Sequence, residues 1–271
     1  MTGEPSFALT TEVPASNDAF GGIVVPLDLT PLADRALATA RILAARAAVP
    51  IHLVTTVSPG LDDADDRAAI VSRALALHAP HVQVHVQHTD DVTVALAKAI
   101  DEVPHPALCV ATHARTAVGG LLFGSTTEEL LRARRVPSVL VGPEADPESV
   151  PRMLTVCVDP GGAPSELLHT AELWRDTMAG DLRVVEVVEP APRKQDAPPE
   201  LLAAARALHA PYRTLESHDP ALALLELTAG HHTLLAVGSH LRHGLQRALL
   251  GSVAAELVRY SARPVIVVPG H

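Results

Sequence analysis

Near the end of this 271-residue chain stands Gly238-Ser-His-Leu-Arg242, followed by Leu249-Leu-Gly-Ser252. A closely similar text stands earlier: Ala111-Thr-His-Ala-Arg115, followed by Leu122-Phe-Gly-Ser125. The identical residues of the two stretches are separated by one constant offset of 127 positions. They are His113 and His240, Arg115 and Arg242, Ser125 and Ser252, and Pro137 and Pro264. Identities at a single offset indicate a tandem duplication, so both halves should share one fold.

The duplication extends to the start of each half. Ile23-Val-Val-Pro-Leu-Asp28 matches Leu154-Thr-Val-Cys-Val-Asp159 at an offset of 131, so loops of unequal length separate the matching segments. The stretch Pro143-Glu-Ala-Asp-Pro147 is polar and proline-flanked, as linkers are. We predict a first domain over residues 20–143 and a second over residues 150–271. Residues 1–19 lack the basic start and apolar core of a signal peptide, and we predict a loose tail there.

Apolar runs and helical spacing alternate along each half. In the first half the pattern predicts strands over 22–27, 51–57, 81–88, 107–111 and 138–141, and helices over 31–48, 65–78, 92–103 and 126–135. The second half repeats this order. Such alternation predicts an α/β fold, with a doubly wound parallel sheet in each half and helices on both faces. Binding sites in such sheets lie at the carboxyl ends of the strands.

Residues 81–88 alternate between valines and polar residues, which predicts a half-exposed edge strand with a polar face. His81 and His85 share that face, but they lie roughly 13 Å apart along a strand, too far to share one ion without other ligands. We therefore predict no metal site there. Cys109 and Cys157 lie in apolar runs and are predicted to be small core residues.

Composition limits the classes of function. Lys and Arg number 21 and Asp and Glu number 31, a formal net charge of −10, and aromatic residues make up only 2%. Nucleic-acid binding needs cationic side chains and stacking surfaces, so we predict no such partner. No apolar run approaches the length of a membrane span, and we expect a cytoplasmic protein without membrane contact. No serine, cysteine or lysine nucleophile stands at a recognisable spacing from a base, which argues against a dedicated enzyme.

The Gly-Ser pair in each half stands at the start of a predicted helix. Backbone N–H groups at a helix start, a glycine that permits close approach and a serine hydroxyl can together bind an anion. The same Gly-Ser pair would also occur if the glycine only formed a turn and the serine only capped the helix, without a bound anion. Arg115 and Arg242, a few residues earlier, are candidate anion partners, because arginine binds phosphate through two parallel hydrogen bonds.

The spacing Gly238-x2-Leu241-x9-Gly251-Ser252 resembles the Gly-x2-Gly-x9-Gly-Ser/Thr signature of the universal stress protein family. The first half shows the same frame at Ala111-x2-Ala114-x9-Gly124-Ser125. The resemblance covers nearly the whole chain. It implies a five-stranded, doubly wound, Rossmann-like domain that is present twice.

In ATP-binding members of that family, the aspartate after the first strand lies near the adenosine. A residue ending the second strand lines the base, and the glycine loop wraps the phosphates. The corresponding positions of the second half, with the nearby arginine, are Asp159, Val187, Gly238, Arg242, Gly251, Ser252 and Val253. The first-half counterparts are Asp28, Thr56, Ala111, Ala114, Gly124, Ser125 and Thr126.

Both loops depart from the signature. Leu241 replaces the middle glycine of the second half, and Ala111 and Ala114 replace the first two glycines of the first half. Added side chains occupy space where backbone would approach phosphate. Three hypotheses therefore stand: a stress-response regulator that senses ATP, with Mg²⁺, or AMP; a nucleotide-free scaffold for an unknown protein partner; and a weak ATPase. The resemblance also implies an internal pseudo-dimer through residues 138–141 and 265–268, and a further homodimer is plausible.

Overall fold

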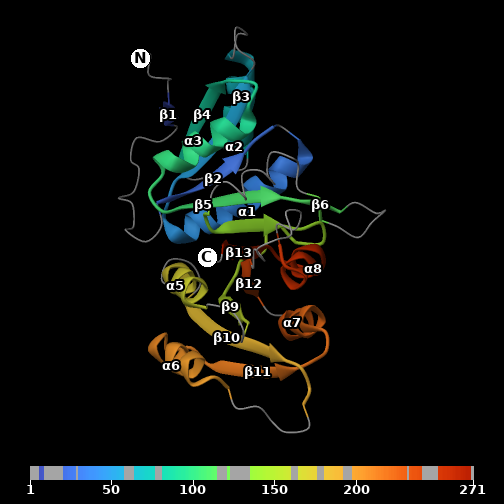
Figure 1. Cartoon of the computed structure of the whole chain (residues 1–271). Coiled ribbons are helices and arrows are strands. Elements are labelled where there is room, and N and C mark those ends of the chain that lie inside the picture. Colours follow the sequence, from blue (N-terminus) through green and yellow to red (C-terminus); the bar gives the residue numbers. More distant parts are fainter. Residues whose placement is uncertain are drawn as a thin grey trace. The chain divides into compact units, whose positions relative to one another are not determined.

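The computed structural model forms two compact units, each built on its own sheet (Figure 1). The first unit comprises residues 1–113 and 122–141, and the second comprises residues 114–121 and 142–271. The structure describes residues 6–8, 21–28, 30–57, 64–76, 81–114, 121–122, 135–159, 164–175, 180–191, 197–230, 232–239 and 250–269.

The sheet of the first unit has the strand order β1-β4-β3-β2-β5-β8. Its strands are β1 (Ser6–Ala8), β2 (Gly22–Pro26), β3 (Ile51–Val57), β4 (Val82–His88), β5 (Pro106–Ala111) and β8 (Ser138–Val141). β2, β3, β4, β5 and β8 pair in parallel, and β1 pairs with β4 antiparallel. A separate two-stranded ladder joins β6 (His113–Ala114) and β7 (Leu121–Leu122). Five parallel strands confirm the predicted doubly wound sheet.

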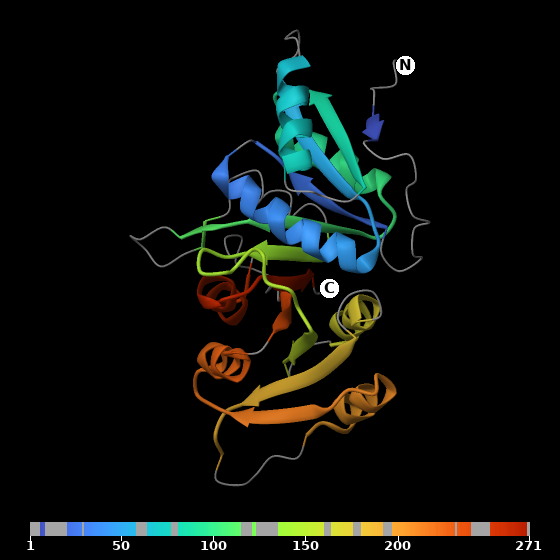
Figure 2. The same ribbon diagram turned by 180° about the vertical axis from the view of Figure 1, so that it is seen from behind.

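Helices cover both faces of this sheet. They are α1 (Pro31–Ala47), α2 (Ala64–Ala76) and α3 (Val92–Glu102). Figure 1 shows α3 in front of the sheet, and the reverse view in Figure 2 shows α1 and α2 in front of it. α3 begins where the Asp91 side chain accepts a hydrogen bond from the backbone N–H of Val94, a standard helix cap. The predicted helix over 126–135 falls mostly outside the described residues.

The second unit repeats the plan with a sheet of order β13-β12-β9-β10-β11, in which every pairing is parallel. Its strands are β9 (Met153–Val158), β10 (Asp181–Val188), β11 (Tyr212–Glu216), β12 (Thr233–Ser239) and β13 (Val265–Pro269). Its helices are α5 (Ser165–Trp174), α6 (Pro199–Ala207), α7 (Pro220–Thr228) and α8 (Ser252–Tyr260). α5 and α6 cover one face, and α7 and α8 cover the other (Figure 1).

The core of each unit consists of valine, leucine, isoleucine and alanine side chains between sheet and helices. Cys109 is fully buried, and its thiol donates to the backbone carbonyl of Ala36 at 3.3 Å, which confirms the predicted core role. Cys157 differs from the prediction, because it is only half-buried. Among the described residues no helix has the length and hydropathy needed to cross a bilayer.

Two expectations at the edge of the first sheet were wrong. Part of the tail predicted to be loose forms β1, whose Ser6 lies opposite His85 of β4. The supposedly half-exposed face of β4 is covered: His85 and Gln87 are each only 8% exposed. α3 packs on that face, where Lys98 donates to the Gln87 side chain at 3.2 Å, so alternation in the sequence did not mean exposure to water.

We predict that Gly21→Ala destabilises the first unit by about 1–3 kcal/mol, because overpacking against backbone cannot relax by a change of rotamer. A Cβ at Gly21 would lie 2.0 Å from the carbonyl oxygen of Pro104. Urea unfolding followed by circular dichroism measures the effect. Gly238→Ala is the matched control, since a Cβ there meets no described atom within 4 Å. Equal stability of the Gly21 variant and the wild type would contradict the packing argument.

Candidate functional site

The carboxyl edge of the second sheet brings together three of the predicted site residues. β9 lies between β10 and β12, and Asp159 directly follows β9. Val187 stands near the end of β10, and Gly238 near the end of β12. Because parallel strands end at one edge, these residues of distant sequence belong to one surface. Asp159 is exposed there, and Val187 and Gly238 are half-buried.

The start of helix α8 supplies the second part of this site. Gly251 is the capping residue, with an extended backbone, and its carbonyl accepts from the N–H of Ala255 at 2.9 Å. Among the described residues no side chain caps this end of the helix. Its first N–H groups therefore lack a side-chain partner there, and they carry the positive end of the helix dipole. Ser252 is exposed at this end, and Val253 is half-buried.

The two glycines of this site are not required by packing. A Cβ added at Gly238 or Gly251 meets no described atom within 4 Å, and neither glycine has a positive φ. The described part of the fold would accept alanine at both positions. Gly142 is the opposite case, because a Cβ there would lie 1.8 Å from the carbonyl oxygen of Val258. The open space beside Gly238 and Gly251 suits close approach of a ligand to the backbone.

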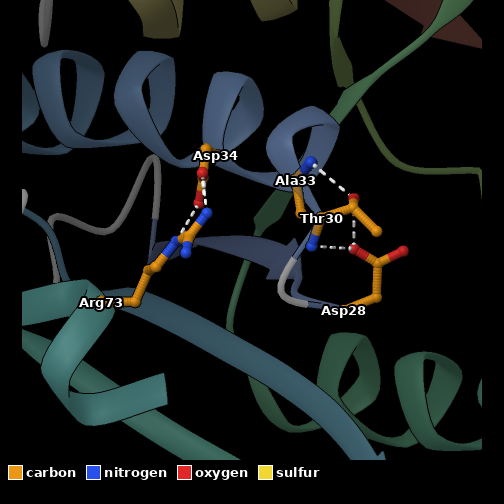
Figure 3. Close-up of polar contacts among 5 residues, drawn as sticks. All are labelled: Asp28, Thr30, Ala33, Asp34 and Arg73. Carbon is orange, nitrogen blue, oxygen red and sulfur yellow. Dashed lines mark hydrogen bonds and ion pairs between the residues drawn. The ribbon is translucent and has the colours of Figure 1, made fainter. Parts of the chain in front are cut away.

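The corresponding aspartate of the first unit is held by a local turn (Figure 3). Oδ1 of Asp28 accepts from the backbone N–H of Thr30 at 3.1 Å and from its hydroxyl at 2.6 Å. The same hydroxyl oxygen accepts from the N–H of Ala33 at 3.2 Å and caps helix α1. Thr30 therefore fixes Asp28 and begins α1 at the same time. The sequence analysis did not single out Thr30, although a threonine before Pro31 is a typical capping signal.

An ion pair next to this turn joins two helices of the first unit. The guanidinium of Arg73, on α2, donates to both carboxylate oxygens of Asp34, in the first turn of α1 (Figure 3). The hydrogen bond with Asp34 raises the pKa of Arg73 above its ordinary value. Both side chains are partly exposed, so the pair orients the two helices more than it stabilises them.

Only some of the remaining first-unit candidates lie among the described residues. Thr56 on β3 and Ala111 at the end of β5 are both half-buried at the carboxyl edge. Ala114 lies in β6. The other loop positions of both halves lie outside the described residues: Gly124, Ser125, Thr126, Leu241 and Arg242.

The structure adds a pair of hydroxyl residues that the site prediction missed. Thr112 directly follows β5 and Ser239 ends β12, again 127 positions apart, and they are 1% and 6% exposed. The Thr112 hydroxyl has no hydrogen-bond partner among the described residues. The repeat offset was the signal that could have identified both, since each follows the first position of the loop signature.

Polar groups elsewhere form no metal cluster in the described parts of the chain: no three His, Cys, Asp or Glu side chains lie close enough to hold an ion. Glu186 is a buried carboxylate that accepts from the Tyr212 hydroxyl at 2.5 Å. Burial and the hydrogen bond to Glu186 raise the pKa of Tyr212. Both residues lie on β10 and β11, away from the glycine pair.

The sequence matches a known protein family, and the structure resembles solved structures of proteins from that family. The model of the universal stress protein family matches residues 20–142 and again residues 150–269. A universal stress protein from Archaeoglobus fulgidus DSM 4304 superposes with a TM-score of 0.64 at 18% identity, covering 92% of this chain and 96% of its own. A putative universal stress protein from Pseudomonas aeruginosa UCBPP-PA14 superposes with a TM-score of 0.60 at 16% identity, covering 93% and 94%. No curated protein matches the chain.

We predict that Thr30→Ala lowers the stability of the first unit by about 1 kcal/mol, because the variant loses the cap of α1. It also releases Oδ1 of Asp28 from both of its donors. Thr30→Ser keeps the hydroxyl and serves as the control. Urea unfolding at neutral pH measures the difference between the two variants. A serine variant as unstable as the alanine variant would show that the methyl group, and not the cap, matters.

Proposed function

Because this chain belongs to the universal stress protein family, we propose that it is a stress-response regulator whose second unit binds ATP or AMP. The observation that carries this proposal is the open backbone at Gly238 and Gly251. Neither glycine is explained by a positive φ or by packing against the described residues; Gly238 lies near the end of β12, and Gly251 caps the start of α8. A phosphate approaching this backbone meets no Cβ, and it meets the positive end of a helix.

Each described residue of the site would have a distinct part in binding. Gly251 and the N–H groups of Ser252 and Val253 would face the phosphates, with the exposed Ser252 hydroxyl as a further donor. The Asp159 carboxylate would accept from the ribose hydroxyls, and Val187 would contact the base. With ATP, a bound Mg²⁺ ion would neutralise part of the phosphate charge. Arg242 would add a cation that can form two hydrogen bonds with phosphate.

The first unit supports a different role. Ala111 and Ala114 add methyl groups where the loop signature has glycine, and Oδ1 of Asp28 already accepts two hydrogen bonds from Thr30. We therefore propose that this unit does not bind nucleotide and is free to serve a protein partner. A weak ATPase activity in the second unit remains the alternative that needs a group to position water, and no described residue supplies one by its geometry.

We predict that the stripped full-length protein binds Mg²⁺-ATP or AMP with one site per chain in calorimetric titration. Gly251→Trp should abolish this heat, because the indole would fill the space that the phosphates need. The variant should fold, since the φ of −60° at Gly251 suits any residue and a Cβ there meets no described atom within 4 Å. Its melting temperature checks this.

Gly124→Trp is the matched control, because Gly124 is the first-half counterpart of Gly251. It should leave binding unchanged. Binding lost in the Gly124 variant and kept in the Gly251 variant would move the site to the first unit. No heat and no thermal shift with either nucleotide would overturn nucleotide binding and leave the partner-binding role.

A further inference from the structure

Two histidines form a buried pair in the first unit, whereas the nucleotide site proposed above belongs to the second unit. His52 on β3 and His85 on β4 are 7% and 8% exposed. Nδ1 of His52 lies 3.1 Å from Nε2 of His85, and the rings stack with centroids 5.3 Å apart. One nitrogen of this contact must carry a proton and the other must not, so the pair is satisfied only when at least one ring is neutral.

The surroundings of His52 oppose a second proton. Its Nε2 is buried and has no hydrogen-bond partner among the described residues. Gly22 lies directly against the ring: a Cβ there would come within 2.8 Å of both Cδ2 and Nε2 of His52. The arrangement with the least cost has Nδ1–H of His52 donating to His85 and a bare Nε2. A proton on that Nε2 would place a buried charge without an acceptor.

Charged groups reach this pair from helix α3. Lys98 and Glu102 both act on His85, and Lys98 is held over the face by its hydrogen bond to Gln87. β2 carries no titratable side chain: it places Gly22 against the ring of His52 and Val24 opposite His52 in register, and β1 contributes Ser6 opposite His85. Glu102 favours a charged His85 and Lys98 disfavours it, so the nearby charges oppose each other and burial dominates.

The second unit carries permanent charges at the same two positions. Strand register makes Arg183 the counterpart of His52, since Thr155 lies opposite Arg183 as Val24 lies opposite His52. Likewise Val185 lies opposite Arg213 as Val54 lies opposite His85. Arg213 is exposed and Arg183 is half-buried, with a hydrogen bond from Arg183 to Thr155 at 2.9 Å. Burial, and then the neighbouring Arg213, lower the pKa of Arg183, but an arginine side chain stays charged in a protein.

We propose that the His52–His85 pair makes the first unit an acid-responsive element, which loosens around β3, β4 and α3 as the pair is protonated while the second unit stays folded. The two repeats differ in the chemistry that this requires: the side chains at these positions are titratable in the first unit and permanently charged in the second. Acid would thus open the partner-binding unit without disturbing the nucleotide site.

The direction of the pH effect follows from proton uptake. Burial, and then the neighbouring His85, lower the pKa of His52 from 6.5 to about 4, and burial lowers the pKa of His85. The unfolded chain therefore binds these protons first, from about pH 6.5 downward. Stability of the first unit falls as the pH falls through this window, until the folded form also binds the proton near pH 4.

The chain contains one natural probe in each unit. Cys109 is fully buried in β5 of the first unit, so its reaction with 4,4′-dithiodipyridine, which proceeds in acid, reports opening of that unit. Trp174, the one tryptophan, is 3% exposed in α5, and its emission reports the second unit. Mass analysis of peptides separates labelling of Cys109 from labelling of Cys157.

The test compares the full-length wild type with His52→Gln/His85→Gln, in which glutamine can hydrogen-bond but cannot titrate. His88→Gln, on the same strand but exposed, is the matched control. Between about pH 7.5 and about pH 4.5, labelling of Cys109 should accelerate more in the wild type and the control than in the double variant, by on the order of 100-fold. Trp174 emission should stay native in all three proteins.

An equal acceleration in the double variant, or loss of native Trp174 emission at the same pH, would overturn the proposal. Should the double variant fail to fold, an NMR titration of the wild-type imidazole resonances decides instead. His52 is expected to titrate near pH 4, and a midpoint for His52 near 6.5 would refute the buried neutral pair.

Discussion

A tight turn cannot connect two parallel strands. After each parallel strand of these sheets, a crossover connection, usually a helix, must therefore return the chain to the end of the sheet where the strands begin. The carboxyl ends of all the parallel strands, and the loops that follow them, therefore lie together at the opposite end of the sheet. In the second unit this brings Asp159, Val187 and Gly238 to one surface beside the start of α8. The residues there can change without disturbing the core, and this freedom lets two copies of one fold differ in chemistry.

Burial decides which chemistry each copy can hold at equivalent points of its sheet. Arg183 and Arg213 stay charged because the guanidinium group is not deprotonated in proteins, whereas the titratable His52 and His85 are covered by α3, with β1 paired along the outer edge of β4. The same backbone register thus holds two permanent cations in one unit and, as we propose, a neutral imidazole pair in the other. The duplication gave both units the same strand register. The elements that cover His52 and His85 influence the protonation state of that pair.

The glycines fall into two groups according to the atoms that surround them. Gly21 and Gly142 lie against backbone carbonyls and cannot carry a side chain, and Gly22 makes room for the ring of His52. A Cβ at Gly238 or Gly251 meets no described atom within 4 Å, so the described residues place no such constraint on them. A sequence motif alone does not distinguish these cases, because it specifies the residue type and not the atoms around it. Only the neighbouring atoms tell a glycine needed for packing from one available to a ligand.

The sequence by itself determined the duplication and the order of strands and helices, because repeats and apolar periodicity are local properties of the chain. It also pointed to Asp28 and Asp159, which follow β2 and β9, and to Gly251, which caps helix α8. The tertiary structure decided what covers each face. The polar alternation of β4 suggested exposure, but α3 buries His85 and Gln87, and a short strand from the tail pairs with the outer edge of β4. The pairing of Asp34 with Arg73 likewise depends on two helices that only the folded chain brings together.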